Sequence, residues 1–331
     1  MFKTLNRCLA ACSASVLLLG LLSEVVDAQE RSPGFRKLAP GVITRISPDI
    51  QEEETFSGPR EMVELTVGAP QLDWEPNLSA KSKTLLADVK ATIFRRSVWG
   101  LEFGFKPLSM MDIDIPQPDG SVKTEKVLYL VYFVRNNGNH LNPEAANDGG
   151  RGTFEVNPTN HSVRFFPNFL LQCHDVDRVY LDKVIPAAVN EIRLREDPNR
   201  KFYNSVTISD VNIPVSTELE DNSVWGVATW VGVDPRSDFF SIYVRGLTNA
   251  YRWQDPPSGF KAGDPPGTGR RFLYKTLQLN FWRPGDSLDH NEDEIRFGVP
   301  NQNQLPAEIT EDQVLKAYGL KERVDYQWVY R

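Results

Sequence analysis

One run of residues limits the fold of this chain more than any other. The sequence VLYLVYFV, from Val127 to Val134, contains only apolar residues and is bounded by Lys126 and Arg135. Successive side chains of a strand point to opposite faces of a sheet, so this run predicts a strand that is buried on both faces. Each face then needs a cover, from another sheet or from helices. We therefore expect Val131 to lie in the core.

Short segments of β character surround this run. They are bounded by Pro, Gly and Asn and do not alternate regularly with helices, which favours an antiparallel β-sandwich over a doubly wound sheet. Pro167 interrupts one of them. The expected strands are 41–46, 62–67, 98–106, 109–115, 127–134, 163–171, 202–208, 224–233, 239–244 and 273–282. The overall prediction is a mainly β protein with two or three short helices.

Three segments show helical signals. Residues 82–95 carry apolar side chains at helical spacing. Pro186 stands at the first position of a helix that we expect to end near Glu196. Thr310 is a suitable N-cap for a last helix, which Gly319 would end.

The strand expected at 273–282 alternates in polarity. Leu277, Leu279 and Phe281 share one face, whereas Gln278 and Asn280 lie on the other. Such alternation is typical of an antiparallel strand with one face in water. On this interpretation, the substitution Gln278→Asp is expected to be nearly silent.

The N-terminal segment, residues 1–28, has the organisation of a secretory signal peptide. Lys3 and Arg7 precede an uncharged stretch, and the sequence up to Ala28 fits a cleavage site. The letters from Leu9 to Cys12 also fit a lipoprotein signal, but the strongest apolar run follows the cysteine instead of preceding it. We expect export, to the periplasm or outside the cell, with cleavage after Ala28. No later segment is apolar enough to span a membrane.

Composition divides the chain into four regions. The signal peptide (1–28) precedes a polar lead-in at 29–58 that could be loosely ordered. Residues 59–300 form the β region, as one large domain or two packed subdomains, and residues 301–331 form a tail with a short helix.

Charge and cysteine content exclude several classes of protein. The net charge is −7, and removal of the signal peptide leaves it unchanged. Without a basic cluster, nucleic-acid binding is not expected. Cys8 and Cys12 leave with the signal peptide, so Cys173 alone cannot form an internal disulfide.

The stretch GDPPGTGRR, residues 263–271, resembles a phosphate-binding loop only at first sight. With Gly269 as the second glycine of the pattern, Asp264, Arg270 and Arg271 occupy positions that require Gly, Lys and Ser or Thr. No nucleotide is therefore expected. The Pro/Gly-rich loop at 254–270 is longer than most connections, so Asp264 and Arg270 are candidates for a surface that binds a partner.

Two segments carry residues of the kind that bind metal ions. Cys173 and His174 are adjacent, but neighbours on a strand point to opposite faces and do not readily share a metal ion. The acidic segment at 286–294 lacks the spacing and glycine of an EF-hand, and a solvated loop is the simpler interpretation. The calcium candidates are Asp286, Asp289, Glu292 and Asp293. No other cofactor is expected.

Catalytic motifs are scarce. The chain has neither a G-x-S-x-G nor an H-E-x-x-H motif. A pair of carboxylates, as in glycoside hydrolases, can be neither identified nor excluded among so many acidic residues. Trp225 and Trp230 lie on opposite faces of one expected strand. We expect one in the core. The other, for which Trp230 is our candidate, would pack at an interface or stack on a sugar ring.

Three segments carry a family resemblance: SVWGLEFGFKPLSMMDIDIPQPDG (97–120), VLYLVYFVRNNGNHLNP (127–143) and VWGVATWVGVDPRSDFFSIYVRGLTNAY (224–251). They resemble an exported-protein family of planctomycete-type bacteria, over most of residues 38–300. The resemblance implies no activity and no site residue. At the level of fold, the apolar strand, the Asn/Gly turn and the Phe-Pro-rich strand resemble immunoglobulin-like sandwiches.

The sequence thus favours an exported, non-catalytic β-sandwich protein. It would bind an envelope protein or a polysaccharide, or have a structural role in the bacterial cell envelope. The alternative is a hydrolase that acts on an envelope or extracellular polymer through a carboxylate pair. The two differ in one feature, because the hydrolase needs a cleft in which two acidic groups meet.

Overall fold

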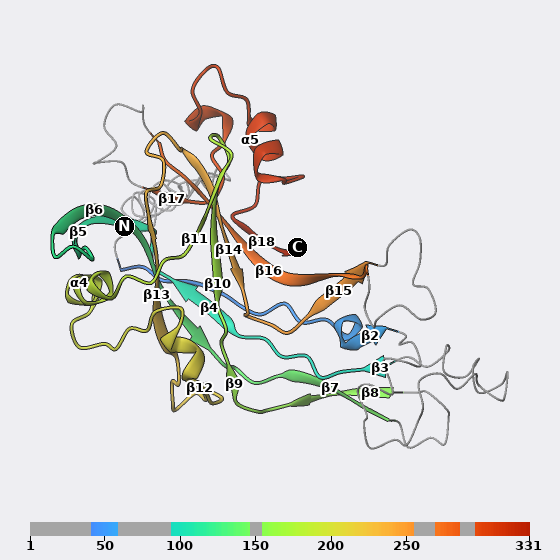
Figure 1. Cartoon of the computed structure of the whole chain (residues 1–331). Helices are drawn as coiled ribbons and strands as arrows, with labels where there is room; N and C mark the ends of the chain where they lie inside the picture. Colours follow the sequence, from blue (N-terminus) through green and yellow to red (C-terminus); the bar gives the residue numbers. More distant parts are fainter. Residues whose placement is uncertain (1–40, 59–93, 146–153, 255–268, 285–294) are drawn as a thin grey trace, which may run out of the picture. The chain divides into compact units, whose positions relative to one another are not determined.

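The computed structural model describes residues 41–58, 94–145, 154–254, 269–284 and 295–331. The chain is mainly β with antiparallel sheets, as the sequence predicts (Figure 1). The strands are β1 (Thr44–Ile46), β2 (Phe56–Gly58), β3 (Phe94–Arg95), β4 (Glu102–Phe105), β5 (Ser109–Pro116), β6 (Val122–Arg135), β7 (His140–Ala145), β8 (Phe154–Thr159), β9 (Val163–Arg164), β10 (Asn168–Cys173), β11 (Arg178–Leu181), β12 (Asn212–Ile213), β13 (Val224–Val231), β14 (Phe239–Arg245), β15 (Tyr251–Gln254), β16 (Arg271–Trp282), β17 (Arg296–Phe297) and β18 (Tyr326–Tyr330). The helices are α4 (Pro186–Glu196) and α5 (Glu311–Tyr318), with short 3-10 turns η1 (Glu52–Thr55), η2 (Thr207–Asp210) and η3 (Gln302–Gln304).

The first sheet is built around β6. Its strand order is β1-β4-β6-β13, and β5 also pairs with β6. Strands β4 and β5 share one edge of β6, where Phe103 is opposite Val134 and Met111 is opposite Val127. The other edge pairs with β13 throughout the apolar run. The predicted central strand is therefore confirmed.

The second sheet has seven strands and is built around β16. Its order is β11-β10-β14-β16-β15, and both β17 and β18 also pair with β16. Strands β14 and β15 share one edge of β16, and β17 and β18 share the other. Three pairs of short strands complete the β structure: β12 with β9, β2 with β3, and β7 with β8.

One continuous core lies between the two sheets, which gives the sandwich-like arrangement that the sequence predicts. Alternate side chains of each sheet point into this core and exclude water. From the first sheet these include Phe103, Phe105, Leu130 and Tyr132, and from the second Phe169, Leu171, Ile242 and Leu279. Several of the aromatic rings are in contact, and those of Tyr132 and Phe169 lie 4.8 Å apart.

Helix α4 covers part of the outer face of the first sheet. Ile185, Ala188 and Ile192 pack against the alternate side chains of β6, among them Val131. Val131 is 1% exposed. Both faces of the central strand are thus buried, one against the second sheet and one beneath the helix.

The C-terminal segment covers the outer face of the second sheet. The prediction that one face of the strand at 273–282 lies in water is therefore wrong. Gln278 does not face water: it is 2% exposed, and Asn280 is fully buried. The Gln278 amide donates to Asn280 Oδ1 (3.0 Å) and to the Tyr318 carbonyl (3.1 Å), and it accepts from Gln327 (2.9 Å). The polar alternation reflects a buried hydrogen-bond network instead of a solvated face.

The prediction of a strand at 202–208 is also wrong. In this segment only Tyr203 makes a bridge, and a 3-10 turn follows. The Asn204 side chain accepts from the backbone N–H groups of Val206 and Thr207, at 3.0 and 2.8 Å, which favours a turn over a strand.

Most of the other expected elements are present. The strand at 163–171 is split around Pro167 into β9 and β10. Thr310 caps α5 by accepting from Gln313 N, and Gly319 ends it in the left-handed conformation. Within the lead-in, 41–58, β1 joins the first sheet. The predicted strand at 62–67 and most of the predicted helix at 82–95 lie outside the described residues. The described end of that helix is wrong, because Phe94 and Arg95 form strand β3. Within those residues, no helix combines the length and apolar character that crossing a bilayer requires.

Candidate ligand-binding site

A row of side chains crosses the outer face of the first sheet beyond the end of α4. Arg45 on β1 pairs with Gly104 on β4, Gly104 pairs with Phe133 on β6, and Phe133 pairs with Trp225 on β13. Strands lie about 4.8 Å apart, so this cross-strand row spans about 14 Å. Four segments far apart in sequence thus meet in one row, in which Arg45 is exposed, Trp225 is partly buried and Phe133 is 2% exposed.

Aromatic contacts connect the cross-strand row from end to end. The Arg45 guanidinium lies 5.4 Å from the Phe133 ring centre, and the Phe133 and Trp225 rings are 5.1 Å apart. At the far end, the Arg200 guanidinium lies 4.3 Å from the Trp225 ring. These are cation–π distances. The row therefore presents a cation at each end of a pair of aromatic rings.

Gly104 makes the row possible. A Cβ atom at this position would overlap the Phe133 ring. Because glycine has no side chain, the Phe133 ring can occupy this space beside β4.

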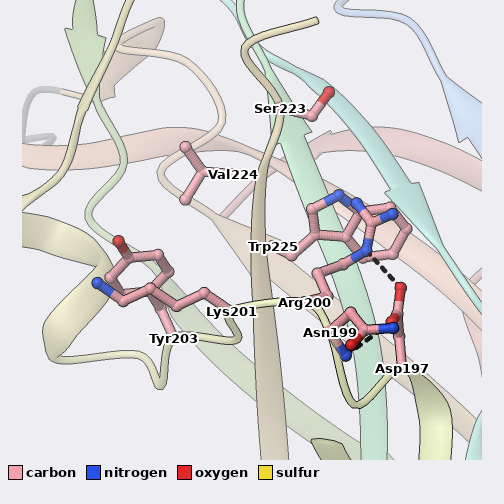
Figure 2. A pocket seen from close by; sticks show the side chains of 8 residues that line it. All are labelled: Asp197, Asn199, Arg200, Lys201, Tyr203, Ser223, Val224 and Trp225. Atoms are coloured by element: carbon pink, nitrogen blue, oxygen red, sulfur yellow. Dashed lines mark hydrogen bonds and ion pairs between the residues drawn. The ribbon is translucent and has the colours of Figure 1, made fainter.

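The turn after α4 fixes Arg200 over the tryptophan. Asp197, the residue after the helix, accepts from the backbone N–H of Asn199 (3.1 Å) and from Arg200 Nε (3.0 Å). The bond from Arg200 is the main reason that the pKa of Asp197 lies below its usual value. Figure 2 shows the guanidinium over the Trp225 ring, with Asp197 beside it. The Arg200 side chain is nevertheless 43% exposed.

The same turn continues along the edge of β13. The Tyr203 N–H donates to the Trp225 carbonyl (3.0 Å), and its carbonyl accepts from Val227 N (2.8 Å). Lys201 Nζ lies 4.4 Å from the Tyr203 ring, on the other side of β13 from Trp225 in Figure 2. A second cation beside an aromatic ring thus lines the same depression as Arg200.

These groups surround an open depression of about 450 Å³. Its lining residues are Asp197, Asn199, Arg200, Lys201, Tyr203, Ser223, Val224 and Trp225. Asp197 is the one carboxylate among them, and it is already engaged by Arg200. The depression can therefore offer a guanidinium, an ammonium, an amide and a hydroxyl to a ligand that carries negative charge.

The structure reverses the roles expected for the two tryptophans. Trp230, the surface candidate, is fully buried in the core between the sheets. Trp225 is partly buried and lines the depression. The sequence reasoning placed the two rings on opposite faces, which is right, but the pattern of one strand does not show which face the second sheet covers.

The other candidate residues do not contribute to this site. Arg270 lies at the start of β16 and is partly exposed. Cys173 points into the core and His174 packs against Tyr318 on the opposite face, so the two do not converge on one metal ion. No group of three or more metal-binding side chains occurs among the described residues. The candidates outside the described residues are Asp264, Asp286, Asp289, Glu292 and Asp293.

Comparisons with protein-family models, with curated proteins and with solved structures found no match for this chain.

Proposed function

We propose that this chain is an exported binding protein of the bacterial cell envelope, and that the cross-strand row with the neighbouring depression binds an acidic polysaccharide. The signal-peptide organisation predicted for residues 1–28 supports this location, in the periplasm or outside the cell. The immunoglobulin-like and planctomycete-family resemblances remain predictions. They are compatible with this function but do not support it.

The observation that carries the proposal is the aromatic row with a cation at each end. Arg200 is exposed at one end of the row, and Arg45 is exposed at the other end. Planar guanidinium groups recognise carboxylates through paired hydrogen bonds. Because the depression is open and shares Trp225 with the row, it suits a segment of a polymer better than an enclosed small molecule.

The hydrolase alternative needs one carboxyl group that stays protonated and a second one beside it. Among the described residues, Asp197 is the only carboxyl group that lines this depression, and its pKa is lowered. A second depression is lined by both Glu125 and Asp234. The pKa of Glu125 is lowered by a bond from Lys123, and that of Asp234 is held well below its usual range by Arg236. Neither carboxyl is suited to act as a general acid, which favours binding over hydrolysis.

Affinity electrophoresis tests the proposal, with polygalacturonate as the acidic polymer and dextran as the neutral one. We expect retardation by polygalacturonate alone, and at least tenfold weaker binding by Arg200→Gln and by Arg45→Gln. Arg252→Gln is the matched control, because Arg252 also lies over an aromatic ring, that of Tyr330, at 4.0 Å. Equal binding by all three variants would refute the proposal.

A further inference from the structure

A second depression opens between the two sheets. It lies at the N-terminal end of β6, whereas the cross-strand row crosses β6 near its C-terminal end. It has a volume of about 520 Å³, within the range of sites for small ligands. Its apolar lining is Met110 from β5, Leu128 from β6, Val233 after β13 and Phe240 from β14. Leu128 and Phe240 belong to the core between the sheets, so a ligand here would reach core side chains.

Arg283, directly after β16, also lines this depression, and it is 6% exposed. Its Nη1 donates to the Pro235 carbonyl at 2.9 Å. Its Nε is buried and has no hydrogen-bond partner among the described residues. Within the part of the chain that the structure describes, no carboxylate lies within ion-pair distance of this guanidinium.

Lys275 is also a buried cation and provides a comparison. Lys275 is 3% exposed and pairs with Glu54 at 2.6 Å and with Asp49 at 3.0 Å. A buried charge costs folding free energy unless an opposite charge compensates it. Arg283 is buried to a similar degree and lacks that compensation within the described residues.

The acidic neighbours in the wall of the depression are already engaged. Asp234 pairs with Arg236 at 2.8 Å and with Arg178 at 3.5 Å. Glu125 pairs with Lys123 at 2.7 Å. Arg283 is therefore available to an anion that comes from outside the protein.

We infer that this depression binds an amphiphile that consists of an apolar chain and a single oxyanion head. The oxyanion bonds to Arg283, and the chain lies against Met110, Leu128, Val233 and Phe240. Guanidinium groups bind carboxylate and phosphate in the same paired geometry, so either head satisfies the chemistry. This inference does not depend on the polysaccharide site.

Isothermal titration calorimetry with dodecanoate and with dodecyl phosphate tests it on the parent protein. We expect at least one of them to bind at a single site, and the tighter one identifies the head group. Dodecanol, which lacks the charge, and acetate, which lacks the chain, should each bind at least tenfold more weakly. Absence of binding by both amphiphiles, or equal binding of acetate, would overturn the inference.

Two variants locate the binding. Arg283→Gln should weaken it at least tenfold, and Arg252→Gln, distant from the lining residues, should leave it unchanged. Val233→Trp keeps the arginine and fills the depression, so it should also abolish binding. Val233→Trp therefore still tests the inference if Arg283→Gln does not fold. Binding of Val233→Trp as tight as that of the parent would place the ligand elsewhere.

Discussion

Gly104 and Gly226 each leave room for an aromatic ring from the neighbouring strand. A side chain at Gly104 would overlap the Phe133 ring, and one at Gly226 would overlap the Tyr132 ring. The two rings lie on opposite faces of the same sheet, so these glycines shape both the core and the proposed binding surface.

The substitution Gly104→Ala tests this fit. Because the added methyl group competes with a buried ring, we expect a loss of about 1–3 kcal/mol in the free energy of unfolding, and weaker polymer binding. Gly120→Ala is the control. Gly120 has φ +85° and open space around it, so its loss should be about 1 kcal/mol without an effect on binding. Identical binding by parent and Gly104→Ala would separate the glycine from the site.

His174 gives the fold a pH dependence. Burial lowers its pKa to about 4, whereas Asp175 acts in the opposite direction. An unfolded histidine titrates near pH 6.5, so the unfolded state takes up the proton first as the pH falls. Stability is therefore complete above about pH 6.5 and decreases toward pH 4. The pKa of His140 is also lowered by burial and acts in the same direction.

Urea unfolding at pH 7.5 and pH 5 measures this effect. For His174 alone, the window between its two pKa values corresponds to a loss of about 2 kcal/mol by pH 5. His174→Gln should reduce the loss by about that amount. If the variant and the parent lose equal stability, His174 is not the buried neutral group described here.

Sequence alone could indicate few residues of the candidate site. Arg45, Gly104, Phe133 and Trp225 come from four distant segments, and only the strand register places them in one row. The sequence does contain one signal, because a glycine between Phe103 and Phe105 in a strand often marks a close approach. That signal does not name the ring that occupies the space.

Among the elements, the C-terminal segment determines whether the outer face of β16 contacts water or protein. Tyr318 of α5 donates its hydroxyl to the Phe281 carbonyl at 2.5 Å, and Asn280 Nδ2 donates to the Val324 carbonyl at 3.0 Å. Alternation of polarity in a strand does not distinguish water from a buried polar network. The caps of α5 were predictable because Thr310 and Gly319 act through local backbone geometry.

The structure predicts that Gln278→Asp is destabilising, whereas the polarity pattern alone predicts a nearly silent change. A carboxylate there would face the Asn280 Oδ1 atom and the Tyr318 carbonyl, which are both acceptors. A buried and unpaired charge of this kind costs about 3–5 kcal/mol. Gln254→Asp, at an exposed position of β15, should stay within about 0.5 kcal/mol of the parent. Equal denaturation midpoints for the two variants would contradict the buried network.

In the whole molecule, strand β6 belongs to the middle of three layers. The second sheet packs on one face of β6, and α4 packs on the other. The apolar run of β6 could be recognised from sequence because a strand buried on both faces has few polar positions. What the sequence could not provide is the partner of each face, since that depends on long-range packing. Helix α4 contacts the face of Val131, and the second sheet contacts the face of Tyr132.

A pair of substitutions on β6 tests this layered arrangement. Val131→Asp buries a carboxylate beneath α4, and the loss of several kcal/mol, against a typical total of about 5–15, should leave little folded protein. Val122 is on the same strand but 63% exposed, so Val122→Asp should be nearly neutral. Circular dichroism during urea unfolding distinguishes them. If Val131→Asp folds like Val122→Asp, β6 is not the central strand.

The indole N–H signals of the tryptophans report directly on whether an acidic polymer binds at the cross-strand row. In a nitrogen-15 NMR titration with oligogalacturonate, the signal of Trp225, assigned with Trp225→Phe, should shift in proportion to occupancy. The signal of Trp230, fully buried between the sheets, should stay in place. Saturable binding that leaves the Trp225 signal unmoved, or no binding at all, would contradict the account.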